Sequence, residues 1–306
     1  MNVGKINRTN VPDRPVFRFI AGSLHLRIEL NIMKHILGIT VLTMTVLAAH
    51  SQFYYKDLVT VQQTNSLWNT LKSSKIRTVT VQSFEANNQP SEGFSVKQDI
   101  SGDRIVTITQ SPANGTSEMT ATYNAAGRLV QTVDTSADYY STTQYDYDGS
   151  GRITTITNNS RSGEFTSVEV HSWSYDAAGR PVRMLRIRNN TDTTYVNFVL
   201  DEKGNPVEEH AVRRKLEEPV IYYYYDDKNQ LTDIVRYNQK AGRLLPTHVF
   251  SYTPQGRIAG MLLVPEGSNE YQRWFYDYDE RGLKVRERVF NKRQELMGKV
   301  EFTYGM

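Results

Sequence analysis

The chain has 306 residues, of which 39% are hydrophobic and 23% charged, with a formal net charge of +3 and no cysteine. This length suggests one or two domains, and the apolar fraction is enough for a packed core. The lack of cysteine excludes disulfide scaffolds, thiolate metal sites and cysteine nucleophiles. The 19 Tyr, 11 Phe and 3 Trp favour strands.

Residues 33–51 have the features of a secretory signal peptide. A basic start at Lys34 precedes an apolar run over 36–47, and small residues lead to a cleavage site after Ser51. The run is shorter than the ~20 residues of a membrane span. We therefore expect cleavage after Ser51, no integral membrane span in the cleaved chain, and a secreted, periplasmic or cell-surface location. A buried core helix is the alternative.

Residues 1–32 precede this signal and carry five basic residues. We expect them to be a mis-assigned or disordered extension, with Met33 as the true start; the alternative is an uncleaved anchor with a basic cytoplasmic tail. Residues 1–51 contain six Lys/Arg and two Asp/Glu, so residues 52–306 hold the other 30 basic and 31 acidic residues, a net of −1. This balance disfavours a nucleic-acid partner.

The rest of the chain is repetitive. The motif Tyr-Asp-x-x-Gly-Arg-Leu/Ile begins at Tyr147, close copies begin at Tyr123 (with Asn124 in place of Asp) and at Tyr175 (with Pro181 at the last position), and weaker copies follow. The positions equivalent to its Gly are 102, 127, 151, 179, 204, 229, 256 and 282, a period of 24–28 residues. A series of this kind is typical of a repeat architecture. The residues that we assign to the structural repeat are Tyr147, Asp148, Gly151, Tyr175, Asp176, Gly179, Gly204, Tyr225, Asp226, Tyr252, Gly256, Tyr278, Asp279 and Gly282.

The motif has the chemistry of a tight turn, because Asp is favoured at the first position of a type I turn and Gly at the fourth. Each motif is therefore expected at the tip of a β-hairpin. The residues before it alternate between aromatic and polar, as in Trp173 and Tyr175 with Ser172 and Ser174 between them. Side chains two residues apart share one face of a strand, so the repeats predict an aromatic wall across a sheet.

The motif and its spacing resemble the YD repeats (RHS-type repeats) of bacterial surface and toxin-delivery proteins, over roughly residues 95–306. The resemblance implies an antiparallel ribbon of hairpins that, in this family, spirals into a hollow shell around a cargo domain. About eight repeats are too few for a closed shell, and we expect no cargo domain after them. The chain therefore resembles more closely the short, exported, repeat-only proteins of such bacteria.

The expected fold is mainly β: an antiparallel meander of hairpin repeats over 96–306, curled into a spiral or barrel-like wrap that buries the aromatic face. Residues 52–95 are expected to form an N-terminal cap of a short helix and a strand. Thr64 or Asn65 is predicted to begin the helix, with Trp68 on its inner side. The segment 76–84 is predicted to be an edge strand.

Few residues suggest a reactive site. We expect His171 and His248 to fill the aromatic face, and we expect neither a metal site nor a cofactor. The Asp column favours turns over calcium, which needs several converging oxygen ligands. The charges of 213–218 are typical of an exposed hairpin loop. The four motif arginines are expected to stack on Tyr or pair with Asp, with an anion- or sugar-acid-binding stripe as the alternative: Arg128, Arg152, Arg180 and Arg257.

Three functions remain open. The first is a non-enzymatic binding or scaffolding module with a polysaccharide or another cell-surface protein as partner; Tyr222, Tyr224 and Phe275 break the polar alternation and suit sugar stacking, which the YD family also suggests. The second is an outer-membrane β-barrel. The third is a hydrolase with carboxylates in the curled interior. The first is favoured because no catalytic motif appears.

Overall fold

The structure is a computed structural model that describes residues 53–265, 268 and 270–306. The expected extension at 1–32 and signal peptide at 33–51 lie outside the described residues. The described residues belong to one unit, 37–306, and begin with a helix, α2 (Lys56–Ser73), followed by the strand β1 (Thr78–Glu85). None of the helices found in these described ranges is long and apolar enough to cross a membrane.

Antiparallel hairpins make up the remainder. The strands are β2 (Ser95–Ser101), β3 (Arg104–Ser111), β4 (Gly115–Tyr123), β5 (Leu129–Thr135), β6 (Tyr139–Tyr147), β7 (Ile153–Ser162), β8 (Phe165–Tyr175), β9 (Pro181–Arg188), β10 (Asp192–Leu200), β11 (Pro206–Arg213), β12 (Leu216–Glu217), β13 (Ile221–Tyr225), β14 (Leu231–Asn238), β15 (Arg243–Tyr252), β16 (Ile258–Leu263), β17 (Gln272–Tyr278), β18 (Lys284–Phe290) and β19 (Leu296–Gly305). Each repeat therefore contributes two strands.

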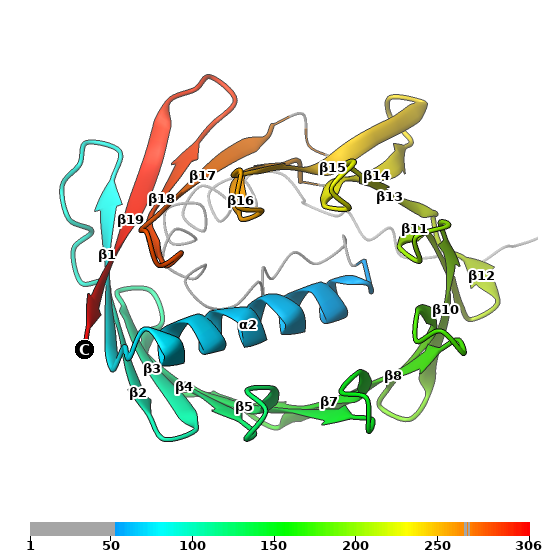
Figure 1. The fold of residues 1–306 in the computed structure, drawn as a ribbon, viewed down its shortest axis with the longest axis horizontal. Coiled ribbons are helices and arrows are strands. Elements are labelled where there is room, and N and C mark those ends of the chain that lie inside the picture. The colour runs from blue at the N-terminus through cyan, green and yellow to red at the C-terminus, as the bar shows by residue number, and fades with distance from the viewer. Residues whose placement is uncertain (1–52, 266–267, 269) are drawn as a thin grey trace, which may run out of the picture. The chain divides into compact units, whose positions relative to one another are not determined.

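The sheet closes on itself. β1 pairs with β2 on one side and with β19 on the other, so a ring of 18 strands results, with the two-residue β12 as a local addition (Figure 1). The predicted barrel-like wrap of antiparallel hairpins is confirmed. The expectation that the repeats are too few for closure is wrong, because β1, which precedes the repeats, joins their two ends. For the same reason β1 is not the edge strand predicted for 76–84.

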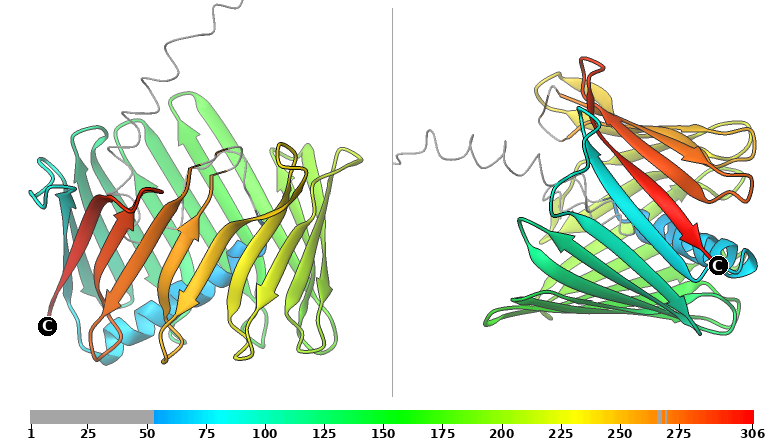
Figure 2. Two further views of the ribbon diagram at one scale, coloured as in Figure 1. Left: turned by 90° about the horizontal axis from the view of Figure 1, so that it is seen from above. Right: turned by 90° about the vertical axis from the view of Figure 1, so that its left-hand side faces the viewer.

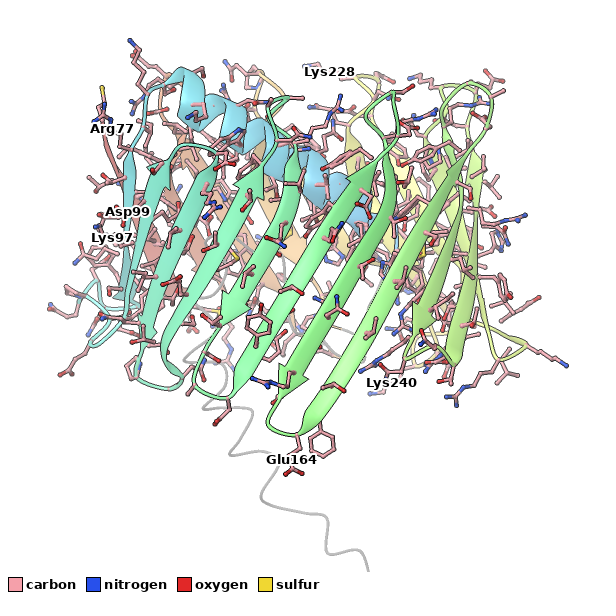
Figure 3. The ribbon with its side chains drawn as sticks, turned by 90° about the horizontal axis from the view of Figure 1, so that it is seen from below. Arg77, Lys97, Asp99, Glu164, Lys228 and Lys240 are labelled. Carbon is pink, nitrogen blue, oxygen red and sulfur yellow. The ribbon has the colours of Figure 1, made fainter. Side chains whose placement is uncertain are left out.

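The two ends of the barrel differ. The motif turns gather at one end, where Lys228 lies, and the other hairpin loops point to the opposite end, where Glu164 lies (Figure 3). The strand register shifts at the first residue of each motif, as between Asp146 and Tyr147. A bulge at this place lets the strand turn sharply while its aromatic side chain still faces inward.

The aromatic wall lines the inside of the barrel. Its buried members include Trp173, Tyr223 and Trp274, whereas the residues between them are more exposed. The core consists of three clusters, around Trp68, around Trp173 and around Tyr223. Burial of a large apolar side chain contributes about 1.5–3 kcal/mol, so the inward face holds the ring together.

Helix α2 lies across the end at which the motif turns gather, as Figures 1 and 2 show together. Trp68 is stacked on Tyr123 with ring centroids 4.1 Å apart. The predicted start of the helix at Thr64 or Asn65 is wrong, since α2 begins at Lys56. Asn65 lies inside the helix, and its Oδ1 accepts a hydrogen bond from the backbone N–H of Leu129 at 2.8 Å.

Candidate functional site

The motif aspartates hold the turns. Asp148 Oδ1 accepts hydrogen bonds from the backbone N–H groups of Ser150 and Arg152, both at 2.9 Å. Hydrogen bonds to the Arg152 backbone are the main reason that the pKa of Asp148 lies below its ordinary value. The same bond to the N–H four residues on recurs at Asn124, Asp176, Asp201, Asp226, Thr253 and Asp279. These oxygens are occupied by turn formation.

The motif arginines connect successive repeats. The guanidinium of Arg152 lies over the ring of Tyr175, one motif further on, at 4.9 Å from its centroid. It also covers Gly179, where an added Cβ would overlap it. Arg128 lies over Tyr147 and Gly151 in the same way, Arg180 over Gly204, and Arg257 over Tyr278 and Gly282. The motif Gly is thus needed both for its positive φ and for this close approach.

The motif tyrosines form a second connection in the opposite direction. The hydroxyl of Tyr175 donates a hydrogen bond to the carbonyl of Ile153 in the preceding motif at 2.8 Å. Equivalent bonds run from Tyr147, Tyr225, Tyr252, Tyr278 and Tyr304 to Leu129, Pro206, Leu231, Ile258 and Lys284. Repeats that carry both residues are therefore bound to the preceding repeat by the Tyr hydroxyl and to the following repeat by the Arg guanidinium.

Three candidate arginines lie on successive turns, Arg257 lies on a later turn at the same end of the barrel, and the four do not converge on one pocket. Arg152 and Arg180 each pair with the Asp of their own turn, with shortest contacts of 2.6 Å. A binding role for this column stays a prediction.

The candidate tyrosines lie on the outer surface. Tyr222 and Tyr224 follow each other on the outward face of β13, and Tyr224 is 49% exposed. Neighbouring strands add Val199 on β10 and Val235 on β14, which line up with Tyr222 through the strand register. We call this surface the outer tyrosine patch: Val199, Glu208, Tyr222, Tyr224, Asp233 and Val235.

The third candidate aromatic residue, Phe275, is not part of that patch. It lies on β17, with β14, β15 and β16 between it and β13. There its ring meets Phe290 edge to face and the guanidinium of Arg288. Arg288 forms an ion pair with Asp277 at 3.0 Å, and further ion pairs lie on the outer face of β18 and β19. This part of the outer surface is charged.

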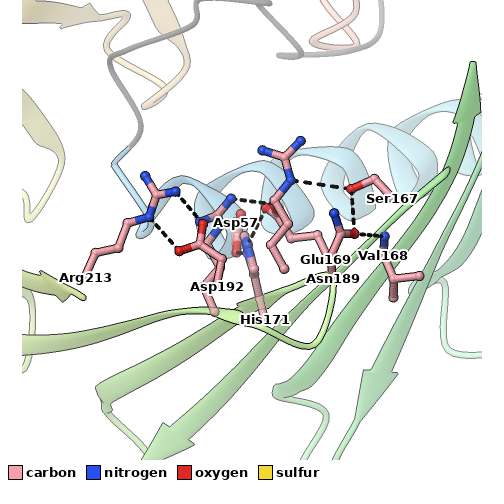
Figure 4. A network of polar contacts seen from close by, with 10 residues as sticks. Asp57, Ser167, Val168, Glu169, His171, Asn189, Asp192 and Arg213 are labelled. Atoms are coloured by element: carbon pink, nitrogen blue, oxygen red, sulfur yellow. Dashed lines mark hydrogen bonds and ion pairs between the residues drawn. The ribbon is translucent and has the colours of Figure 1, made fainter. Parts of the chain in front are cut away.

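A polar network faces the interior between α2 and β8–β11 (Figure 4). His171 bonds through Nδ1 to Asp57 at 2.6 Å and through Nε2 to Glu169 at 2.9 Å. Glu169 also accepts from Arg186 at 2.7 Å, and Asp192 pairs with Arg213. Arg213 was predicted to be a loop charge; it instead ends β11 and points inward, because it is paired in register with Thr194.

The network determines the charge of its members. Burial would lower the pKa of His171, but Asp57 and Glu169 raise it to about 9. Burial would raise the pKa of Glu169, but hydrogen bonds from His171 and Arg186 lower it to about 2. At neutral pH the ring is therefore an imidazolium between two carboxylates, which suits it to fastening Asp57 of α2 to the wall and not to accepting a proton.

A buried carboxylate fastens the start of α2. Glu209 is 1% exposed and accepts hydrogen bonds from the backbone N–H groups of Tyr54 and Tyr55 and from the hydroxyl of Tyr223, at 2.7–3.0 Å. Burial raises its pKa. These N–H groups belong to the N-cap residue Tyr55 and the residue before it, and they have no intrahelical acceptors, so Glu209 takes the place of a capping side chain.

An open groove of about 750 Å³ runs between α2 and the motif turns. Amide and hydroxyl groups of α2 face Tyr147, Arg152 and Tyr175 across it. Arg152 already covers the ring of Tyr175. The groove therefore offers hydrogen-bonding groups, but the ring of this motif tyrosine is not available to stack on a ligand.

The other two histidines in the described part of the chain have separate surroundings. His248 packs on Phe53 and Phe250, and burial lowers its pKa to about 4. His210 binds Glu208 at 2.7 Å on the outside. Within the described residues, no group of three His, Cys, Asp or Glu side chains could hold a metal ion.

Sequence reasoning missed Asp57, Glu169, Arg186, Asp192 and Glu209. For the four residues on strands the one signal is parity, as with Glu209, which stands opposite the inward Phe198; Asp57 lies on α2, where strand parity does not apply. The bulge at each motif changes which residues of the following strand face inward. Counting every second residue through the turn therefore does not identify the inward residues of that strand.

Residues 123–164 match the protein family described as "RHS Repeat". No curated protein matches the chain. Among solved structures, a porin-like protein from Bacteroides uniformis is 12% identical, with a TM-score of 0.41, and the alignment covers 75% of this chain and 98% of that one. A porin-like protein from Bacteroides vulgatus is 14% identical, with a TM-score of 0.27 and the same coverage.

The Tc holotoxin pore of Photorhabdus luminescens is 13% identical, with a TM-score of 0.32; the alignment covers 70% of this chain and 12% of that chain. The matched segment 123–164 spans the motifs at Tyr123 and Tyr147 and the strands between them. The resemblance inferred from the sequence is therefore confirmed, and the chain carries RHS-type repeats.

Proposed function

We propose that this protein is an exported, non-enzymatic repeat barrel that binds a polysaccharide through the outer tyrosine patch. The observation that carries the proposal is the position of Tyr222 and Tyr224. The motif tyrosines point inward and are occupied by contacts between repeats, whereas these two rings face solvent on adjacent outward positions of one strand. Exposed aromatic rings of this kind mark interaction surfaces.

The non-enzymatic part of the proposal is supported by the interior acids. Asp57, Glu169 and Asp192 are engaged with His171, Arg186 and Arg213, and Glu209 is engaged with backbone N–H groups. A hydrolase would need one carboxyl group free to donate a proton and another free to act as nucleophile or base. Assaying the purified chain for release of reducing sugar from a panel of polysaccharides tests this; turnover would contradict it.

The alternative function is an outer-membrane barrel, which a closed antiparallel ring favours. Charged residues on the outer face argue against it, for example Asp277, Arg286 and Glu301. A Lys or Arg on the lipid face costs about 2–4 kcal/mol at the midplane. Release of the protein by osmotic shock supports our proposal, and recovery only after detergent extraction supports the alternative.

Our first prediction concerns the patch. Replacing Tyr222 and Tyr224 together by Ala should lower binding to the glycans that the unaltered chain retains on a glycan array by at least tenfold, because stacking area is lost. The matched control replaces Tyr139 and Tyr140, which are 40% and 43% exposed on β6, and should leave binding unchanged. Equal loss in both variants, or no binding of any glycan, would contradict the proposed function.

A further inference from the structure

The outer tyrosine patch carries carboxylates beside its rings. Glu208 stands directly across from Tyr222 in the strand register, and Asp233 stands directly across from Tyr224. Directly opposed residues on one face have Cβ atoms about 4.5–5.5 Å apart. Each ring of the patch therefore has a carboxylate as its immediate neighbour.

These two carboxylates are not neutralised by a Lys or Arg side chain. Glu208 binds His210 at 2.7 Å, and both side chains are more than a third exposed. Among the described residues, no side chain forms an ion pair with Asp233. Asp233 is paired on its other side with Val249, an apolar residue. The patch combines aromatic rings with available negative charge.

The motif arginines do not offset this charge, because they lie at the turn end of the barrel. There Arg152 and Arg180 are bound to Asp148 and Asp176. An acidic sugar would meet like charge at the patch and occupied guanidinium groups at the turns. A ligand with an ammonium group would instead meet carboxylates and ring faces, both of which attract cations.

We infer that the outer tyrosine patch selects a polysaccharide of amino sugars with free ammonium groups, whose pyranose rings stack on Tyr222 and Tyr224 while the ammonium groups lie beside Glu208 and Asp233. The inference rests on the proposed function and specifies its ligand class. It excludes N-acetylated and uronic-acid polymers as preferred ligands.

The test compares three probes by calorimetry with the full chain: glucosamine oligomers, their N-acetylated counterparts of equal length, and uronate oligomers. The glucosamine oligomer should bind at least tenfold more tightly than the N-acetylated one, and the uronate oligomer should not bind. Asp233→Asn should lower the affinity for the glucosamine oligomer about fivefold and leave the affinity for the N-acetylated oligomer unchanged. The control Asp146→Asn, an exposed outward carboxylate on β6, should change neither.

The outcomes separate the two proposals. Equal binding of the N-acetylated and free-amine oligomers, or preference for uronate, overturns the ligand class while the polysaccharide function stands. Absence of binding by every oligomer overturns both. Equal weakening by Asp233→Asn and Asp146→Asn would identify the binding as general attraction of a polycation and would also overturn the inference.

Discussion

The motif Gly is needed for two reasons, its backbone conformation and the close approach of an arginine. Gly151 has φ of +81°, a conformation that strains any residue with a Cβ, and the guanidinium of Arg128 lies where that Cβ would be. Three glycines of other hairpin loops, Gly115, Gly163 and Gly242, have open space at the same position, and Gly163 has φ of +57°. Comparison of the two sites separates backbone strain from contact between repeats.

We predict that Gly151→Ala lowers the free energy of unfolding by about 2–4 kcal/mol, from strain of about 1–3 kcal/mol together with the displaced arginine. Gly163→Ala should cost only the strain. Urea unfolding followed by tryptophan fluorescence measures both. Equal losses would show that the contact between Arg128 and the next repeat contributes nothing.

Turn chemistry was predictable at this scale because it depends on residues four apart, as with Asp148 and Arg152. The inward charges were not. Glu169, Arg186 and Asp192 come from three strands, and the inward position of Arg186 depends on a register shift between Ser174 and Tyr175 that no local pattern reveals. Which side chains lie side by side on neighbouring strands depends on the strand register, and the register depends on how the whole ring of strands closes.

At the scale of elements, α2 depends on the barrel that it closes. It has no side-chain cap of its own, and most of the stability of a helix in a protein comes from tertiary packing. Glu209 holds its start, His171 holds Asp57, and Trp68 stacks on Tyr123. The helix itself was predictable from the sequence, but its start was not, because the residue that caps it lies on β11.

The His171 contacts make this attachment depend on pH. A folded pKa of about 9 against 6.5 means that the stabilisation is complete below pH 6.5 and is lost as pH rises through 9. The folded pKa of Glu169, about 2 against 4.5, gives stabilisation above pH 4.5 that is lost toward pH 2. Stability from this network is therefore greatest between about pH 4.5 and 6.5.

We predict that the free energy of unfolding of the unaltered chain falls between pH 6.5 and 9, and that His171→Gln flattens this fall. Urea titrations at a series of pH values measure it. His210→Gln, on the outer surface, is the matched control and should keep the fall. An unchanged alkaline slope in His171→Gln would mean that the ring is not charged in the folded protein.

At the scale of the whole molecule, closure of the ring depends on β1. The repeats make a ribbon with two free edges, on β2 and β19, and β1 occupies both. Curling was predictable, since an aromatic wall must be covered. Closure was not, because the alternating residues of β1 look the same whether the strand has one partner or two.

We predict that removing residues 296–306, which include β19, leaves β1 and β18 with unpaired edges and increases the oligomeric state of the protein. Size-exclusion chromatography with light scattering measures this. Val168→Thr, an outward change on β8, is the control that should leave the elution unchanged. A monomeric truncated chain of unaltered stability would show that the ring need not be closed.

The pairing of Thr78 with Gly305 also determines when, during synthesis of the chain, the ring can close. Of the strands in the described residues, β1 is synthesised first, yet one of its two partners is β19, which is synthesised after the other strands in that part of the chain. Contacts between residues so distant in sequence form slowly, and until then an unpaired edge offers itself to other chains. The barrel therefore closes only after β19 has been made, and any product that stops before Leu296 stays open.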